Sequence, residues 1–311
     1  MPERPLLLIR YPLAGGRFDE VAARCEVVCT GGPILERATP EQLERAWGLW
    51  TFGERIDDAL LDRMPALRCV VNFGVGVDGV DRGALERRGI AFAWPVGANA
   101  EAVADHAWAL LLAVRHRIVE CDALVRRGGW DAEDYLPPTL ADAHRARLGI
   151  VGLGAIGRAV ARRALGFDME VAYATPRPLP ADEERRLGVR LLDLDELMAW
   201  ADVVTVHCPL TDETRGLISR ERIARMRPDA ILVNTARGAV ADEAALVEAL
   251  VARRIAGAGL DVFADEPHVP AALLELPHVV LTPHNADATP GAEAALIERC
   301  ARVALDVLDA G

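Results

Sequence analysis

The sequence predicts an α/β fold made of two doubly wound parallel-sheet domains, and three observations support this. Short apolar runs alternate with helical patterns along most of the 311 residues, which is typical of parallel sheets covered by helices on both faces. A glycine-rich turn stands near residue 152, in the middle of the chain. Nearly half of the chain precedes that turn, so a separate unit is expected to fold before it.

The first half of the chain is predicted to hold five strands. Its apolar runs occupy residues 5–9, 26–29, 46–50, 68–72 and 90–93, and helix-like stretches separate them. One long helix is predicted over residues 99–118, where apolar side chains recur at helical spacing. Two glycines at 128 and 129 then interrupt the pattern.

The second half repeats the alternation. Its strand candidates are residues 148–151, 170–174, 189–192, 203–207, 230–234, 257–261 and 279–282. A Thr289-Pro290 pair then opens a last helix, with threonine as the N-cap and proline at the first helical position. We expect this helix to return to the first unit. The predicted domains are therefore residues 1–97 plus 284–311, and residues 98–283.

The composition excludes several classes of protein. The chain is 51% hydrophobic and 26% charged, with a net charge of −12, so no nucleic-acid partner is expected. No apolar run approaches the roughly 18 residues that cross a bilayer, so no membrane partner is expected. Six cysteines without a CxxC pair argue against disulfides and against a metal site, and they favour a cytoplasmic location. The chain has no lysine, so any anion must be bound by arginine or by backbone amides.

The glycine-rich turn follows the first apolar run of the second domain and reads Gly152-Leu-Gly154-Ala155-Ile156-Gly157. The first glycine allows a tight turn, the second lets the backbone approach a pyrophosphate, and the third lets the next helix pack on the strand. The amides at the start of that helix, at Ala155 and Ile156, would face the pyrophosphate. The pattern predicts a dinucleotide-binding, Rossmann-like second domain, and we expect a flavodoxin-like first domain. A glycine-rich turn without a ligand is the alternative.

The end of the next strand bears on which nicotinamide cofactor binds. An NAD site usually has an acidic residue there, about 20 residues after the glycines, but this chain has Ala174. Thr175 and Arg177 follow and could bind a 2′-phosphate. We therefore expect NADP(H) to be preferred, with NAD(H) possible. An exposed arginine in a proline-rich turn is the alternative interpretation of Arg177.

Four further motifs accompany the fingerprint in a fixed order. They are Asn72-Phe-Gly-Val-Gly-Val-Asp78-Gly-Val-Asp81, Asn234-Thr-Ala-Arg237-Gly, Gly259-Leu-Asp261-Val-Phe-x-x-Glu266-Pro and Thr282-Pro-His284. This order resembles the D-isomer-specific 2-hydroxyacid dehydrogenase family over almost the whole chain. The resemblance implies a substrate (catalytic) domain, an NAD(P)-binding domain, an interdomain cleft and hydride transfer between NAD(P)H and a 2-oxoacid.

Three residues of these motifs suit the chemistry of that reaction, which needs a cation for the carboxylate and a proton donor for the developing alkoxide. Arg237 and His284 each follow a predicted strand at its carboxyl end, where doubly wound sheets bind ligands. By resemblance Arg237 grips the substrate, His284 is the acid/base, and Glu266 orients His284 and favours its protonated form. Taken singly, each could be an ordinary surface or packing residue.

The resemblance also assigns binding residues. It implies that the loop of Val75, Gly76 and Val77 holds the substrate carboxylate through its backbone amides. The cofactor candidates beyond the fingerprint are His207, Cys208, Pro209, Thr214, Thr235, Ala236 and Asp261. Asp261 would meet the nicotinamide carboxamide. Cys208 is interpreted as a wall residue, because no partner base is evident.

Some positions depart from the family or stay open. Asn285 and Asp287 stand where the family usually has an apolar and a small residue, which changes the polarity beside the substrate. Trp50 and Phe52 follow a predicted strand and either line the substrate pocket or belong to the core or rim. The sequence does not say which 2-oxoacid is the substrate or which direction is physiological.

The resulting expectation is an enzyme that resembles glyoxylate/hydroxypyruvate reductases and acts on a small 2-oxoacid or 2-hydroxyacid. The alternatives are a non-catalytic nucleotide-sensing protein like the dehydrogenase-related corepressors, or a dehydrogenase of another small acid such as phosphoglycerate, phosphite or formate. The resemblance also implies a homodimer through the cofactor domain, with the long helix and the segment 128–147 as contact surfaces.

Overall fold

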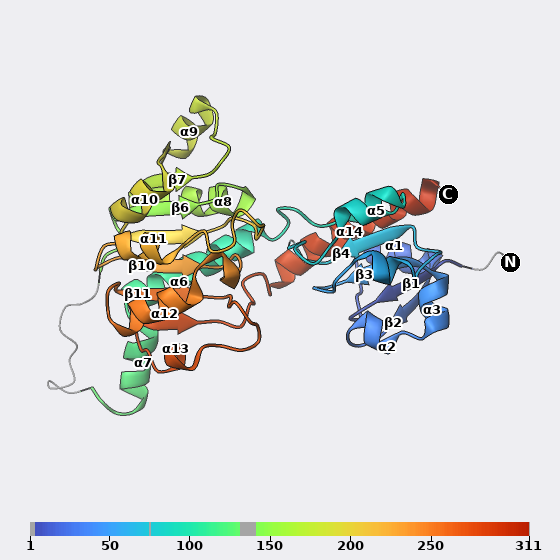
Figure 1. Cartoon of the computed structure of the whole chain (residues 1–311), viewed down its shortest axis with the longest axis horizontal. Helices are drawn as coiled ribbons and strands as arrows, with labels where there is room; N and C mark the ends of the chain where they lie inside the picture. Colours follow the sequence, from blue (N-terminus) through green and yellow to red (C-terminus); the bar gives the residue numbers. More distant parts are fainter. Residues whose placement is uncertain (1–3, 75, 131–140, 311) are drawn as a thin grey trace. The chain divides into compact units, whose positions relative to one another are not determined.

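The computed structural model describes residues 4–74, 76–130 and 141–310, which form two compact units (Figure 1). Unit 1 contains Met1–Asn99 and Ala288–Gly311, and unit 2 contains Ala100–Asp287. Each unit is built on one parallel sheet covered by helices. The predicted fold class, two α/β domains with doubly wound parallel sheets, is confirmed. None of the helices in the described ranges is long and apolar enough to cross a membrane.

Unit 1 has a five-stranded sheet in the order β2-β1-β3-β4-β5, with all neighbours parallel. Its strands are β1 (Leu6–Ile9), β2 (Glu26–Cys29), β3 (Ala46–Thr51), β4 (Cys69–Asn72) and β5 (Ala91–Ala93). Its helices are α1 (Arg17–Arg24), α2 (Ile34–Arg37), α3 (Pro40–Arg45), α4 (Asp58–Leu61), α5 (Arg82–Arg87) and α14 (Pro290–Ala310). This strand order is flavodoxin-like. Successive strands are added on one side of β1 and then, from β3 on, on the other side, and such sheets bind ligands at this switch point between β1 and β3.

The last helix, α14, belongs to unit 1. Thr289 caps it through its hydroxyl, which accepts a hydrogen bond from the amide of Ala292 at 3.2 Å. The buried face of α14, including Cys300 and Ala304, packs with α1 and with the β1 side chain of Leu7 in one apolar cluster. The helices α2 to α5 contribute to the other cluster of this unit, on the opposite face of the sheet. Both faces are therefore covered, as the apolar strands require.

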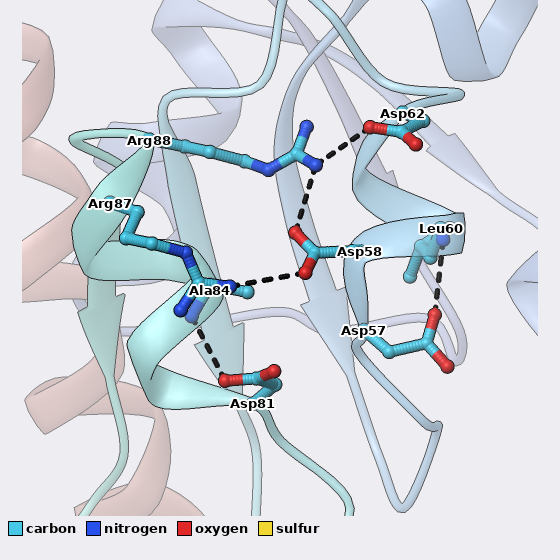
Figure 2. A network of polar contacts seen from close by, with 8 residues as sticks. All are labelled: Asp57, Asp58, Leu60, Asp62, Asp81, Ala84, Arg87 and Arg88. Carbon is cyan, nitrogen blue, oxygen red and sulfur yellow. Dashed lines mark hydrogen bonds and ion pairs between the residues drawn. The ribbon is translucent and has the colours of Figure 1, made fainter.

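A polar network fastens α4 to α5 (Figure 2). Asp57 and Asp81 cap these two helices. Between them the Asp58 carboxylate accepts hydrogen bonds from Arg87 at 3.1 Å and from Arg88 at 2.9 Å. Hydrogen bonding from Arg88 holds the pKa of Asp58 below its usual value. The network is exposed, so its contribution is to local geometry more than to stability.

The loops that leave β3 and β4 are tied together beside this network. The amide of Ile56 donates to the carbonyl of Gly79 at 2.9 Å, and the amide of Asp81 donates to the carbonyl of Ile56 at 2.8 Å. The segment that leads from β4 to α5, with its glycines, is thus fixed to the rest of unit 1.

Unit 2 has a seven-stranded parallel sheet in the order β12-β11-β10-β9-β6-β7-β8. Its strands are β6 (Arg147–Val151), β7 (Glu170–Ala174), β8 (Val189–Leu191), β9 (Val203–Val206), β10 (Ile231–Asn234), β11 (Gly257–Leu260) and β12 (Val279–Leu281). Its helices are α6 (Ala100–Arg115), α7 (Ile118–Arg126), α8 (Ala155–Ala164), α9 (Ala181–Leu187), α10 (Leu194–Trp200), α11 (Arg220–Arg225), α12 (Glu243–Val251) and α13 (Ala271–Leu274), with short 3-10 helices at Leu165–Phe167 and Gly238–Val240. Successive strands are added on one side of β6 up to β8 and on its other side from β9 on, so the switch point lies between β6 and β9, as in dinucleotide-binding sheets.

The helices of unit 2 cover the two faces of its sheet. Buried side chains of α6 and α8, such as Leu111 and Val160, pack with Ile150 in one apolar cluster. Those of α10, α11 and α12, such as Leu197 and Leu250, form the other cluster. The carboxyl ends of the strands are left for the loops that bear the motifs.

The long helix predicted over residues 99–118 is wrong in its extent. The structure has α6, which ends at Arg115, and a second helix, α7, which begins at Ile118. Arg117 between them has a φ of 50°, in the left-handed region that stops an α-helix. The Arg117 guanidinium bonds the carboxylate of Glu120, one turn further on, with one contact of 2.7 Å. The apolar pattern runs on through the break, so periodicity could not reveal it.

Candidate active site

The glycine fingerprint forms a tight turn between β6 and α8. Gly152 has a φ of 92°, and a Cβ atom there would lie 2.7 Å from the amide nitrogen of Cys208. A Cβ on Gly157 would lie 2.3 Å from the carbonyl oxygen of Gly152. A Cβ on Gly154 would meet nothing within 4 Å, so the space above this residue is open. Gly152 and Gly157 allow close packing, and Gly154 leaves room for a ligand, as the motif predicts.

The residues around the turn fit a dinucleotide. Helix α8 begins at Ala155 without a side-chain cap, so its first amides are available to a phosphate. Among the described residues, the buried Nδ1 of His207 and the buried hydroxyl of Thr235 have no hydrogen-bond partner. Buried polar groups without hydrogen-bond partners are rare, and a bound cofactor would supply partners for these two.

His207 and its neighbours form a wall after β9. The His207 Nε2 lies 2.8 Å from the hydroxyl of Thr205, and burial lowers the pKa of His207 to about 3, so the ring is neutral. Burial raises the pKa of the Cys208 thiol to about 11, which favours the interpretation of Cys208 as a wall residue and not a nucleophile. The Thr214 hydroxyl donates to the Pro209 carbonyl at 2.6 Å and closes this loop on itself.

The end of β7 bears no acid. Ala174 is buried, Thr175 is half-buried and Arg177 is exposed in the loop that leads to α9. On α9, Glu183 pairs with Arg158 at 2.9 Å, and Glu184 accepts from the hydroxyl of Tyr173 at 2.6 Å. The region therefore presents arginine and hydroxyl groups at the position where NAD-specific sites place a carboxylate.

Arg237 follows β10 in a turn that is held on both sides. The Asn234 side chain accepts from the amide of Ala236 at 3.0 Å and donates to the carbonyl of Arg237 at 3.0 Å. The next residue, Gly238, touches the loop after β11, since a Cβ there would lie 2.0 Å from the carbonyl carbon of Phe263. Only glycine allows this approach. It brings the Arg237 loop against the loop that bears Glu266.

Glu266 and His284 form a direct pair. The Glu266 carboxylate accepts from the Nδ1 of His284 at 2.7 Å, and its other oxygen accepts from the amide of Phe263 at 3.0 Å. A carboxylate only accepts, so the proton of this bond belongs to Nδ1. The side chain of His284 is 44% exposed, although its Nδ1 is bonded to Glu266.

Asp261 holds the turn on which His284 sits. Its side chain has no exposure to solvent, and its oxygens accept from the hydroxyl of Thr282 at 2.6 Å and from the amides of Asn285 and Ala286 at 3.0 and 3.1 Å. The backbone carbonyl of Asp261 also accepts from the amide of His284 at 2.8 Å. His284 has a φ of 50°, a conformation that costs a non-glycine residue about 1–2 kcal/mol. These bonds keep the turn in that conformation.

The glycine loop of unit 1 is also held by one side chain. The Asn72 amide group donates to the carbonyls of Gly74 at 2.7 Å and of Gly76 at 2.8 Å. Both carbonyls are thus turned toward Asn72. Val75 lies outside the described residues, and the substrate contacts of Gly76 and Val77 stay predictions.

Trp50 and Phe52 both line a cavity of about 320 Å³ in unit 1. The cavity lies at the carboxyl ends of β1 and β3, where the strand order reverses, and its other lining residues are Ile9, Arg10, Tyr11, Pro12, Leu13, Thr51, Phe73 and Glu293. This is the position at which a doubly wound sheet binds ligands, and the volume is within the usual range of small-molecule sites.

A match to a protein-family model identifies the family of this chain. The model of the D-isomer specific 2-hydroxyacid dehydrogenase NAD binding domain matches residues 108–286, which include the fingerprint, Arg237, Glu266 and His284. This chain belongs to the D-isomer-specific 2-hydroxyacid dehydrogenase family. The predicted family is therefore confirmed, and the protein is an NAD(P)-dependent oxidoreductase.

Named relatives and solved structures agree with this. The chain is 43% identical to a glyoxylate reductase of Thermococcus onnurineus, over 81% of this chain and 76% of the relative. It is 42% identical to a glyoxylate/hydroxypyruvate reductase B of Yersinia enterocolitica, over 79% of this chain and 76% of the relative. Among solved structures, an NADPH-dependent glyoxylate/hydroxypyruvate reductase of Sinorhizobium meliloti, in complex with NADP and malonate, is 33% identical with a TM-score of 0.84, covering 99% and 93% of the two chains.

Sequence reasoning singled out Arg237, Glu266 and His284, whose roles in the reaction stay predictions, and it missed residues that hold the loops of the site. Asn72, Asn234 and Gly238 position the loops but were not singled out for that task, although each lies in a motif. The positions of the two asparagines could have indicated this role, since an asparagine at the end of a buried strand commonly forms hydrogen bonds with the following turn.

The His284–Glu266 pair predicts a loss of activity for Glu266→Gln. The carboxylate accepts from the Nδ1 of His284 and keeps the ring in one orientation and one tautomer, whereas an amide can also donate to Nδ1. In the variant, kcat/KM should therefore fall about 10²–10⁴-fold in both directions, because one ring exchanges the proton in both. Measuring kcat/KM for reduction and for oxidation checks this, with Glu266→Asp as the charge-retaining control. Unchanged kcat/KM in both directions would separate Glu266 from His284.

Proposed function

We propose that this protein is a 2-oxoacid reductase of the glyoxylate/hydroxypyruvate type. The observation that supports it most is the pairing of His284 with Glu266, on loops that also pack against the turn of Arg237. An acid/base and a planar cation together are what reduction of a 2-oxoacid requires.

The chain's own residues would perform the proton and charge steps. The bound nicotinamide cofactor supplies the hydride. Arg237 binds the substrate carboxylate in two parallel hydrogen bonds. His284, protonated, donates from Nε2 to the alkoxide oxygen that develops at the carbonyl, and Glu266 stabilises the imidazolium beforehand. The reverse reaction uses the neutral ring as a base.

We further propose that the backbone amides of Gly76 and Val77 contact the substrate carboxylate. The bonds from Asn72 support this, because they occupy the carbonyls of the loop and so prevent these negative dipoles from facing an anion. For the cofactor, we propose contacts with the fingerprint, with the wall from His207 to Pro209 and with Thr235. Asp261 would reach the nicotinamide only through an oxygen that already accepts bonds from the turn.

The proposed cofactor preference is for NADP(H). Ala174 at the end of β7 removes the carboxylate that would repel a 2′-phosphate, and Thr175 and Arg177 can bind one. We also propose a cytoplasmic homodimer. Exposed apolar side chains on α7 and just beyond it, among them Ile118 and Trp130, favour a covered surface there. Of the predicted contact segment 128–147, residues 131–140 lie outside the described ranges.

The carboxylate role of Arg237 predicts that lysine cannot replace it. Lysine keeps the charge but loses the planar pair of donors. Arg237→Lys and Arg237→Ala should both lose about 2–5 kcal/mol of transition-state stabilisation in kcat/KM for hydroxypyruvate. Steady-state kinetics with glyoxylate and hydroxypyruvate check this, and an unchanged dissociation constant for NADPH is the control. Near-wild-type kinetics of the lysine variant would exclude Arg237 from the site.

The end of β7 predicts that the wild type has a higher kcat/KM with NADPH than with NADH. The double variant Ala174→Asp/Arg177→Ala should reverse the order, because the new carboxylate repels the 2′-phosphate and accepts the ribose hydroxyl. Arg185→Ala, which removes an exposed arginine of α9, is the matched control and should change neither value. Wild-type enzyme that uses NADH as well as NADPH would contradict the assignment.

A further inference from the structure

Helix α6 lies on β11 in a regular register. On the strand, alternate residues Gly257, Gly259 and Asp261 face the helix. A Cβ on Gly257 would lie 2.8 Å from the side chain of Val114, and a Cβ on Gly259 would lie 2.8 Å from the Cβ of Leu110. Four helical residues rise about 6 Å and two strand residues about 6.6 Å, so the two repeats match.

The same register places His106, one turn before Leu110, beside Asp261. The His106 Nε2 lies 3.0 Å from the hydroxyl of Thr282 and 3.5 Å from the carboxylate of Asp261. The two strand glycines are what let α6 come close enough for this contact. A histidine of the first two turns of α6 is thereby joined to the turn that bears His284.

The directions of these hydrogen bonds follow from the donors. The Asp261 carboxylate only accepts hydrogen bonds, so the Thr282 hydroxyl donates its single proton to Asp261 at 2.6 Å. That hydroxyl must then accept from His106, which fixes the proton of the His106 ring on Nε2. The three side chains form one ordered chain of donors that ends on a buried carboxylate.

We propose that His106 is a positioning residue for His284, acting through Thr282 and Asp261. The inference rests on the proposed role of His284 as the acid/base. Without His106 the Thr282 hydroxyl loses the donor that orients it, and one of the bonds to Asp261 weakens. Asp261 then holds the 282–286 turn less firmly, and His284, in its left-handed conformation, leaves its alignment with the reacting carbonyl more often.

Two matched pairs of variants test this in the full-length enzyme. His106→Leu removes the donor, whereas His106→Gln can restore one near the position of the ring Nε2. Thr282→Val removes the hydroxyl, whereas Thr282→Ser keeps it. The measurements are kcat and KM for hydroxypyruvate reduction, and NADPH binding by fluorescence titration.

We expect His106→Leu and Thr282→Val each to lower kcat about 10- to 100-fold, the loss seen when an outer hydrogen-bond partner of a reacting group is removed. KM and the NADPH dissociation constant should change less than about threefold, since Arg237 and the fingerprint are untouched. His106→Gln and Thr282→Ser should recover most of kcat. The double variant His106→Leu/Thr282→Val should be no worse than the worse single one, because both break the same chain.

A purely structural role gives a different pattern. Val114→Ala on the same helix removes packing against β11 and should lower Tm without lowering kcat. If His106→Leu behaves like Val114→Ala, if glutamine is no better than leucine, or if the two losses add in the double variant, the inference is overturned. If His106→Leu fails to fold, the comparison of Thr282→Val with Thr282→Ser still decides. The variant His284→Gln distinguishes failure of the proposed function from failure of this inference. If His284→Gln stays active, the proposed function is overturned. If His284→Gln is inactive and His106→Leu has wild-type kcat, only the inference about His106 is overturned.

Discussion

The site of unit 2 depends on one buried carboxylate. Asp261 has no solvent exposure, yet it accepts bonds from a hydroxyl and two backbone amides of the turn that carries His284. Hydrogen bonds to a carboxylate are stronger than those between neutral groups, and a buried polar group needs such partners. Because the carbonyl of Asp261 also binds the amide of His284, side chain and backbone fix the same turn. Asp261 therefore fixes the turn from which the His284 ring projects.

Glycines decide where the loops can meet. Gly238 lets the Arg237 turn touch the backbone at Phe263, and Gly259 lets α6 touch β11. In each case a Cβ atom would lie closer than 3 Å to a neighbour, so even alanine would move a loop or a helix. Arg237, Glu266 and His284 follow three different strands of the sheet, and the Gly238 contact brings the loops of the first two together. The function of the site thus depends on residues that have no side chain.

The sequence alone predicted the fold class and the strands, because buried apolar runs alternate with helical patterns. It also placed Arg237, Glu266 and His284 after buried strands, where the structure has them, and their roles in the reaction stay predictions. It did not predict the support of His284, since the 282–286 turn bonds to Asp261 across some twenty residues. It missed the break at Arg117, because apolar residues continue through it. The contact of His106 with Thr282 depends on a helix-to-strand register, and local patterns do not contain that register.

A crystal structure of Asp261→Ala tests the central claim most directly, through the distance between the Nδ1 of His284 and the carboxylate of Glu266. Alanine leaves the Thr282 hydroxyl and two buried amides without their acceptor, at a cost of about 1–3 kcal/mol each. The account predicts that the 282–286 turn rearranges, that His284 leaves its φ of 50° and that the 2.7 Å contact with Glu266 is lost. An unchanged turn with the 2.7 Å contact intact would contradict the claim that Asp261 holds His284 in place.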